Sequence, residues 1–164
     1  CMIVYHGSIE ILKNPDVMHS KKYLDFGQGF YLTTFENQAK KWAARKGMRQ
    51  KKTPIVNVYE MSEEWQNLKV LSFEKENEEW LDFVCACRKG EPLNKEYDII
   101  IGNVADDDVF KTVDMYFRGL WDKKKVLSEL RYYKMNNQIC IVNQETLNRL
   151  LTYQNSYEVK CDGR

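Results

Sequence analysis

One segment near the start of the chain, Leu24 to Ala44, restricts the fold more than any other. It opens with the glycine-bearing turn DFGQG, continues with the short apolar run FYLT, and ends in a stretch whose apolar residues recur at helical spacing. Thr33 and Glu36 have the spacing of a capping box, in which two side chains satisfy the first free amides of a helix. The segment therefore predicts a turn, a strand and a capped helix in direct succession, with Gly47 closing the helix.

The rest of the chain alternates strand and helix patterns irregularly. Apolar runs predict strands at residues 2–7, 54–61, 68–73, 97–102, 138–142 and 152–160. Amphipathic patterns predict helices at residues 74–88, from Asp106, from Asp122 and at 144–151, with Gly90 and Gly119 as stops. The sequence has no regular strand–helix–strand repeat, no P-loop and no dinucleotide-binding glycine pattern. We therefore expect an α+β fold, with residues 1–164 forming a single domain.

The composition argues against several classes of protein. A net charge of +1 gives no reason to expect strong attraction to nucleic acid or to a membrane surface. Five cysteines and two histidines have spacings that fit neither a disulfide framework nor a zinc site. We expect no metal, and a reduced, cytoplasmic protein with buried thiols. The basic cluster from Lys40 to Lys52 is interpreted as a solvated face, with attraction of an anionic substrate as the alternative.

Four motifs taken in order resemble a known family. They are YHGS, DFGQGFYLT with its helix, YDIIIGNVADD and QICIV. Their order is similar to that of bacterial ADP-ribosyltransferase-like domains, whose pocket is related to those of diphtheria toxin and the poly(ADP-ribose) polymerases, the His–Tyr–Glu class. The resemblance extends from Tyr5 to about Leu151. It implies a split β-sheet core with flanking helices, and NAD as the co-substrate.

The resemblance also implies roles for the first two motifs. His6 would bind a ribose hydroxyl of NAD, and Gly7, lacking a Cβ, would let the cofactor approach its backbone, with Ser8 beside it. Tyr31 and Trp42 would enclose the nicotinamide ring, with tryptophan in place of the more usual tyrosine.

The same interpretation gives Gly29 the role of admitting the ligand to this aromatic clamp. His6, Tyr31 and Gln138 are the expected catalytic residues.

The third catalytic position departs from the class. Gln138 stands where glutamate is usual. A glutamine can hold a ribose hydroxyl, but it cannot take a proton or balance the charge that develops when nicotinamide leaves. Another carboxylate is one remedy: Glu145 is nearest in sequence, and Asp106 to Asp108 are further candidates. Asp25 either locks the glycine turn or faces the ligand, and we favour the turn.

Three functions remain open at this stage. The first is a transferase, a glycosyltransferase acting on NAD, that passes ADP-ribose to a protein or nucleic-acid acceptor. By resemblance it would be a bacterial toxin restrained by a cognate antitoxin. The second is a non-catalytic module that binds NAD or ADP-ribose, since Gln138 replaces the acid. The third is a protein-interaction domain on the same scaffold.

Overall fold

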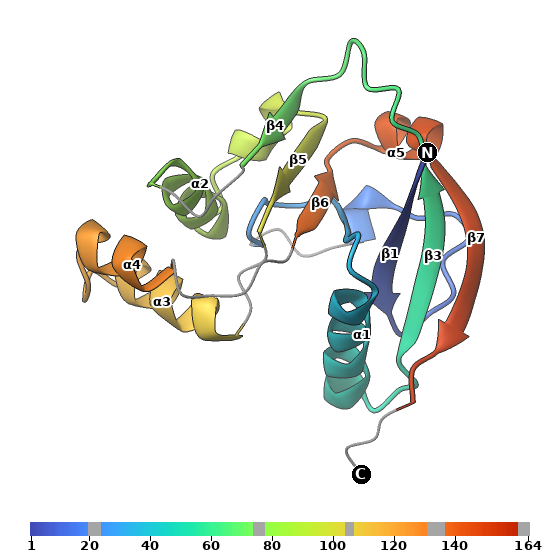
Figure 1. Ribbon diagram of the computed structural model, residues 1–164, viewed down its shortest axis with the longest axis horizontal. Coiled ribbons are helices and arrows are strands. Elements are labelled where there is room, and N and C mark those ends of the chain that lie inside the picture. Colours follow the sequence, from blue (N-terminus) through green and yellow to red (C-terminus); the bar gives the residue numbers. More distant parts are fainter. Residues whose placement is uncertain (20–23, 74–77, 104–106, 131–136, 161–164) are drawn as a thin grey trace.

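The computed structural model describes residues 1–19, 24–73, 78–103, 107–130 and 137–160. The strands are β1 (Met2–Ser8), β2 (Phe30–Leu32), β3 (Ile55–Met61), β4 (Val70–Ser72), β5 (Ile99–Gly102), β6 (Gln138–Ile141) and β7 (Leu151–Glu158). The α-helices are α1 (Glu36–Gln50), α2 (Glu78–Arg88), α3 (Asp107–Phe117), α4 (Lys123–Leu130) and α5 (Gln144–Leu150), and two short 3-10 helices cover Val17–His19 and Leu93–Glu96. Figure 1 shows their arrangement.

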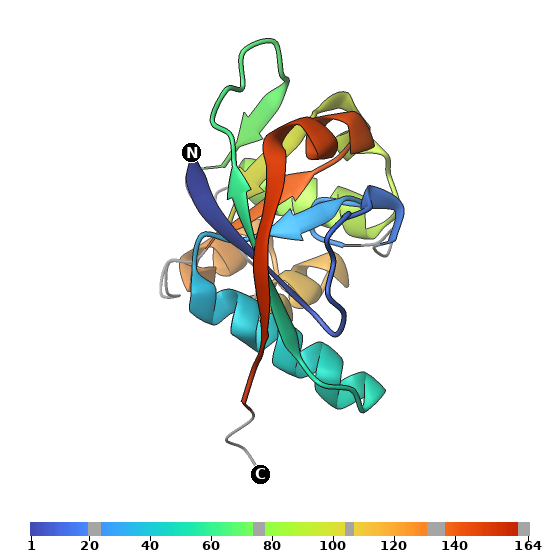
Figure 2. The ribbon, with the colours of Figure 1, turned by 90° about the vertical axis from the view of Figure 1, so that its right-hand side faces the viewer.

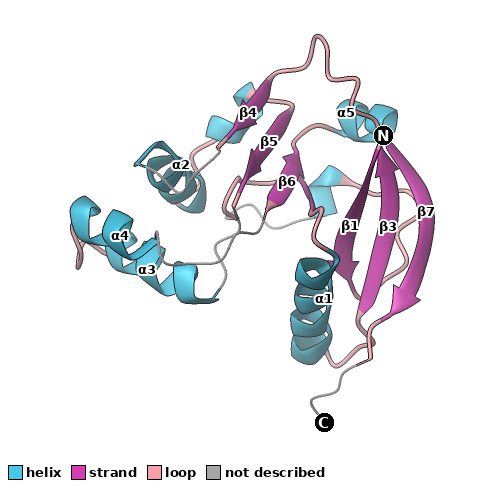
Figure 3. Ribbon diagram, in the orientation of Figure 1, coloured by secondary structure: helices cyan, strands magenta, loops and turns pink. Residues whose placement is uncertain are grey.

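The strands form two sheets that meet at one point. One sheet has the order β1-β3-β7 and is antiparallel, and the other has the order β2-β6-β5-β4, in which only the β4–β5 pair is parallel. Tyr5 of β1 and Thr33, just after β2, exchange two backbone hydrogen bonds of 2.8 and 3.0 Å that join the sheets. The mixed sheets and irregularly inserted helices confirm the predicted α+β class (Figure 3).

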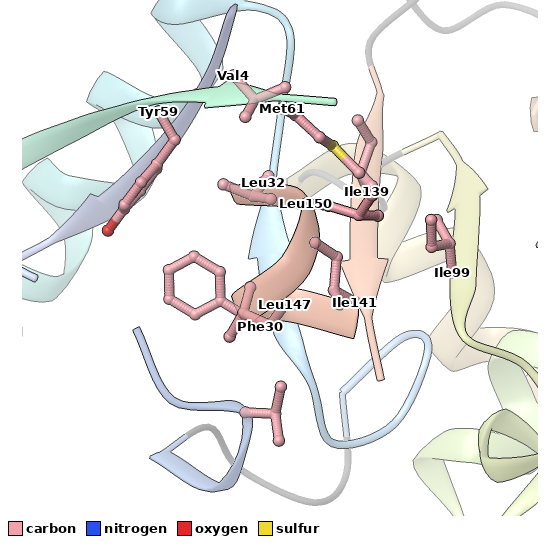
Figure 4. Packing of buried hydrophobic residues seen from close by; sticks show 11 residues of the cluster. Val4, Phe30, Leu32, Tyr59, Met61, Ile99, Ile139, Ile141, Leu147 and Leu150 are labelled. Carbon is pink, nitrogen blue, oxygen red and sulfur yellow. The ribbon is translucent and has the colours of Figure 1, made fainter. Parts of the chain in front are cut away.

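The main core lies between the two sheets. Side chains alternate along β6, so Ile139 and Ile141 face this core while Cys140 faces the opposite side of the sheet. In Figure 4, Val4 and Met61 of the three-stranded sheet face Leu32 and the two isoleucines, and α5 covers the end of the cluster. Burial of these aliphatic side chains fixes how the sheets pack, because apolar area removed from water is the main favourable term in folding.

The helices cover the outer faces of the sheets. Helices α2, α3 and α4 lie together beside the four-stranded sheet, where Trp80, Val113 and Val126 pack around Ile100. Helix α1 packs on β1 and β3 through Ala39, where small residues allow close approach (Figure 2). Helix α1 and the α2–α4 group therefore belong to different sheets.

The capping box predicted for α1 is wrong. Phe35 is the N-cap residue, with an extended backbone and no side-chain capping bond. The Thr33 hydroxyl accepts from the Phe35 amide and donates to the side chain of Asn137, while the Glu36 carboxylate accepts from the Tyr157 hydroxyl. Both side chains therefore serve tertiary contacts in place of the helix end.

The predicted end of α1 is also wrong. The helix continues through Gly47 to Gln50, and Lys51 takes the left-handed conformation with φ 55°. A Cβ at Gly47 would lie 2.7 Å from the Lys52 carbonyl oxygen and 3.2 Å from Pro54 Cδ. Gly47 is therefore needed where the returning chain crosses the helix.

Other local predictions are confirmed. Gly90 and Gly119 follow α2 and α3 with φ of 92° and 76°. Asp122 caps α4 by accepting from the Lys125 amide at 2.8 Å, whereas the predicted cap Asp106 lies outside the described residues. Cys85, Cys87 and Cys140 are free and buried, as expected. In the ranges given above, no helix has the length and apolar character needed to cross a membrane.

Candidate functional site

A cavity of about 1100 Å³ opens beside the point where the two sheets meet. Its lining comes from β1, β2 and β6, from the turn before β2, from one face of α1, and from residues of α2 and α3. Of the seven predicted site residues, six line it: His6, Ser8, Gly29, Tyr31, Trp42 and Gln138. The bridge between Tyr5 and Thr33 brings β1 and β2 side by side, which places residues distant in sequence around one space.

His6 is held in one orientation and one charge state. Its Nδ1 lies 2.6 Å from the backbone oxygen of Tyr31, and its ring stacks on Phe30 with centroids 4.2 Å apart. A carbonyl can only accept, so this hydrogen bond assigns the proton to Nδ1 and leaves Nε2 as an acceptor. Burial, assisted by the charge of Lys46, lowers the pKa of His6 from 6.5 to about 3. His6 therefore offers a neutral acceptor and no base near pH 7.

The absence of a side chain at Gly7 makes room for α1, and the predicted contact of its backbone with a cofactor stays a prediction. A Cβ there would lie 2.2 Å from the Ala39 carbonyl oxygen and 2.7 Å from the Ala43 amide, so the missing side chain admits α1. The Gly7 carbonyl accepts from Lys46 Nζ at 2.9 Å, at the same strand edge where Tyr5 binds the second sheet. A ligand could therefore contact only the backbone groups of Gly7.

The hydroxyl of Tyr31 is engaged in the glycine turn, and Tyr31 also lines the cavity. Its hydroxyl donates to the Gly27 carbonyl at 2.5 Å and accepts from the Phe26 amide at 3.0 Å, which closes the glycine turn. Burial raises the pKa of Tyr31, so the hydroxyl stays protonated. Because the hydroxyl is engaged in the turn, the ring is the part of Tyr31 available to a ligand.

The lack of a side chain at Gly29 also serves packing. A Cβ there would lie 2.5 Å from Cys140 Sγ and 2.8 Å from the Ile141 carbonyl oxygen. Close packing against β6 therefore requires glycine here, and the admission of a ligand by Gly29 stays a prediction.

One face of α1 lines the cavity with an aromatic ring followed by cations. Trp42, Arg45, Lys46 and Arg49 recur at helical spacing, and all four line the cavity. Arg45 and Arg49 are exposed and Lys46 is half-buried, so the basic cluster is solvated as expected, and three of its members also border the cavity that holds His6. The periodicity of α1 was the signal in the sequence that could have found them.

Gln138 is buried at the start of β6 and bound to a carboxylate. Its Nε2 donates to Asp25 Oδ2 at 3.2 Å and to the Asn103 carbonyl at 3.3 Å. The other carboxylate oxygen of Asp25 accepts two hydrogen bonds from Arg88, at 2.5 and 2.9 Å. Asp25 and Arg88 also line the cavity, and each side chain is 14% exposed. The carboxylate beside Gln138 is therefore Asp25, for which the sequence favoured a role in the turn over one facing the ligand.

Of the other proposed carboxylates, the structure describes only the side chain of Glu145. Glu145 lies in α5, is exposed, and does not line the cavity. Asp106 lies outside the described residues, and Asp107 and Asp108 begin α3. Within the described chain, no group of three His, Cys, Asp or Glu side chains is arranged to hold a metal ion.

The sequence profile described as "Protein of unknown function (DUF3990)" matches residues 2–153. The chain belongs to this family. The matched region contains every residue that lines the cavity, from His6 to Gln138, so the cavity lies wholly within the family domain. Curated proteins gave no match.

Proposed function

We propose that this protein is an NAD-dependent ADP-ribosyltransferase. One observation carries the proposal: a single cavity gathers the neutral His6, the rings of Tyr31 and Trp42, the buried Gln138 and the cations of α1. These are the groups that would meet the hydroxyls, the nicotinamide and the pyrophosphate of NAD. The two sheets joined at Tyr5 and Thr33 support the split-sheet core that the sequence resemblance implies.

The nicotinamide, its ribose and the pyrophosphate of NAD each have a proposed partner in the cavity. A ribose hydroxyl would donate to Nε2 of His6, which is neutral and oriented by its Nδ1 bond. The nicotinamide ring would lie between Tyr31 and Trp42, where a cationic ring gains about 0.5–2 kcal/mol from aromatic faces. Arg45, Lys46 and Arg49 follow Trp42 on the same face of α1, the nearest of them about one helical turn, or about 5 Å, further along. They would bind the pyrophosphate, which a single ribose separates from nicotinamide.

The reaction breaks the glycosidic bond between ribose C1′ and the nicotinamide nitrogen. The electron pair of that bond leaves with nicotinamide, which becomes neutral, and C1′ takes on oxocarbenium character. An acceptor X–H then forms the C1′–X bond and releases its proton. The protein would hold NAD in the reactive conformation and keep water away from C1′, so that positioning supplies most of the rate enhancement.

The acceptor is proposed to be a macromolecule, a protein or a nucleic acid, in the cytoplasm. The toxin role and the antitoxin partner rest on the sequence resemblance. Arrest of growth on expression, relieved by His6→Ala, would support the toxin role, and unaffected growth with active enzyme would remove it.

A second function is favoured by one specific observation. Gln138 carries an amide where proton transfer would need an acid, so a module that binds NAD without turnover is the alternative. Calorimetry with NAD together with chromatography of released nicotinamide separates the two. Binding with no nicotinamide release in the presence of a cell lysate would establish the module, and absence of binding would reject both.

The cavity cations provide a second test of the binding mode. Removing the charges of Arg45 and Arg49 by substitution with Gln should weaken NAD binding and flatten its dependence on salt, because ionic contacts with phosphate are screened. The matched control is Lys125→Gln, a cation of α4 that packs on Trp121 away from the cavity. Equal salt dependence in the double variant and the wild type would refute pyrophosphate binding by this face.

A further inference from the structure

The strongest feature that has no role so far is a series of three hydrogen-bonded side chains that ends at the cavity. Arg88 binds one oxygen of Asp25, and the other oxygen of Asp25 accepts from the amide nitrogen of Gln138. The three residues come from the end of α2, the turn before β2 and the start of β6. Asp25 and Gln138 are 113 positions apart, so the fold alone brings them together.

The donor and acceptor roles of these side chains fix the orientation of the Gln138 amide. A carboxylate and a carbonyl can only accept, so both groups near the amide of Gln138, Asp25 Oδ2 and the Asn103 carbonyl, require the nitrogen on their side. The amide oxygen Oε1 is then on the opposite side, and no described residue donates to it. Gln138 lines the cavity, so Oε1 is the group it offers to a ligand.

We infer that Asp25 is a positioning residue: held by Arg88, it turns Gln138 so that Oε1 accepts a hydrogen bond from the 2′-hydroxyl of the ribose attached to nicotinamide. The inference rests on the proposed function. Gln138 would then accept a hydrogen bond from the ribose, as a carboxylate would. The buried Asp25–Arg88 pair would orient Gln138 in addition to closing the turn.

The substitution Asp25→Asn should remove the fixed orientation of Gln138. Arg88 requires an acceptor, so it would retain the remaining oxygen of the new amide and leave an NH₂ group facing Gln138. Two NH₂ groups repel, and only the Asn103 carbonyl at 3.3 Å still favours the glutamine nitrogen, so a donor would compete with the acceptor that Gln138 presents to the cavity. Adding Gln138→Glu to this variant restores complementarity, because a carboxylate accepts from the new NH₂ group and keeps an acceptor in the cavity.

The test compares the affinity for NAD with that for an analogue in which fluorine replaces the 2′-hydroxyl. Fluorine cannot donate, so the wild type should bind NAD roughly tenfold more tightly, the worth of one hydrogen bond. We expect the affinity ratio to fall toward one in Asp25→Asn and to recover at least threefold in the double variant. Glu145→Gln, exposed and outside the cavity, is the matched control and should keep the wild-type ratio.

The outcomes separate the two proposals. Absence of NAD binding by the wild type would refute the proposed function and this inference with it. NAD binding with the same ratio in the wild type and Asp25→Asn would overturn the inference alone, because a purely structural Asp25 weakens both ligands equally. If Asp25→Asn does not fold, the double variant decides: a ratio near one contradicts the positioning role, and a ratio of at least threefold supports it.

Discussion

Acidification should destabilise this protein through His6. The imidazole is buried and bound to the Tyr31 carbonyl, and its pKa in the folded chain is about 3, against 6.5 when exposed. The unfolded chain therefore binds more protons below pH 6.5, and stability falls as the pH falls. The gap between the two pKa values corresponds to about 5 kcal/mol, reached in full only below pH 3, and to about 2 kcal/mol at pH 5.

The assay is urea unfolding followed by tryptophan fluorescence at pH 7 and pH 5. The comparison variant is His6→Asn, whose amide can still donate to the Tyr31 carbonyl but does not titrate. Every other ionisable group is present in both proteins, so their contributions cancel in the difference. We expect the wild type to lose about 2 kcal/mol more than the variant between the two pH values. Equal losses would refute a buried, neutral His6.

Three further predictions concern stability and reactivity. Gly7→Ala should lower the free energy of unfolding by roughly 1–3 kcal/mol, because its methyl group would meet the Ala39 carbonyl; unchanged urea unfolding would contradict this packing role. Tyr31→Phe should cost roughly 1–3 kcal/mol by the same assay, since it leaves a turn amide without its acceptor, yet weaken NAD binding less than Tyr31→Ala; equal losses of affinity would argue against a role for the ring. Cys87 and Cys140 should resist iodoacetamide at pH 8 until urea is added, because burial raises the pKa of both thiols, that of Cys87 to about 12; mass spectrometry of the native protein would reveal any exception.

Local patterns located most of the elements. The continuous apolar run before Gly102 and the alternating run before Met61 are strands in the structure, and Gly90 and Gly119 end helices as predicted. These signals are strong because the periodicity of burial and the left-handed backbone of glycine depend on neighbours in sequence.

Predictions from local sequence were wrong where a side chain forms a hydrogen bond with a distant residue. Thr33 has the right spacing to cap α1, but its hydroxyl donates to Asn137, which is 104 positions away. Glu36 likewise binds Tyr157, 121 positions away. The N-cap position falls on Phe35, two residues after Thr33, and the Glu36 carboxylate is bound to Tyr157, so spacing alone does not decide the cap.

The same division applies to the cavity. Motifs in the sequence named His6, Tyr31, Trp42 and Gln138, and the structure places all four around one space. The sequence did not indicate that Arg88 would reach Asp25 across 63 positions or that Asp25 would bind Gln138, because contacts of this kind depend on how the sheets pack.

The sequence by itself determined the fold class, the order of most elements and the residue types available for chemistry, since hydrophobic periodicity and glycine positions are properties of short segments. Tertiary structure alone decided the neutral state of His6, the packing reason for Gly7 and the orientation of Gln138. These depend on burial and on donors and acceptors from distant parts of the chain, which meet only when both sheets have formed.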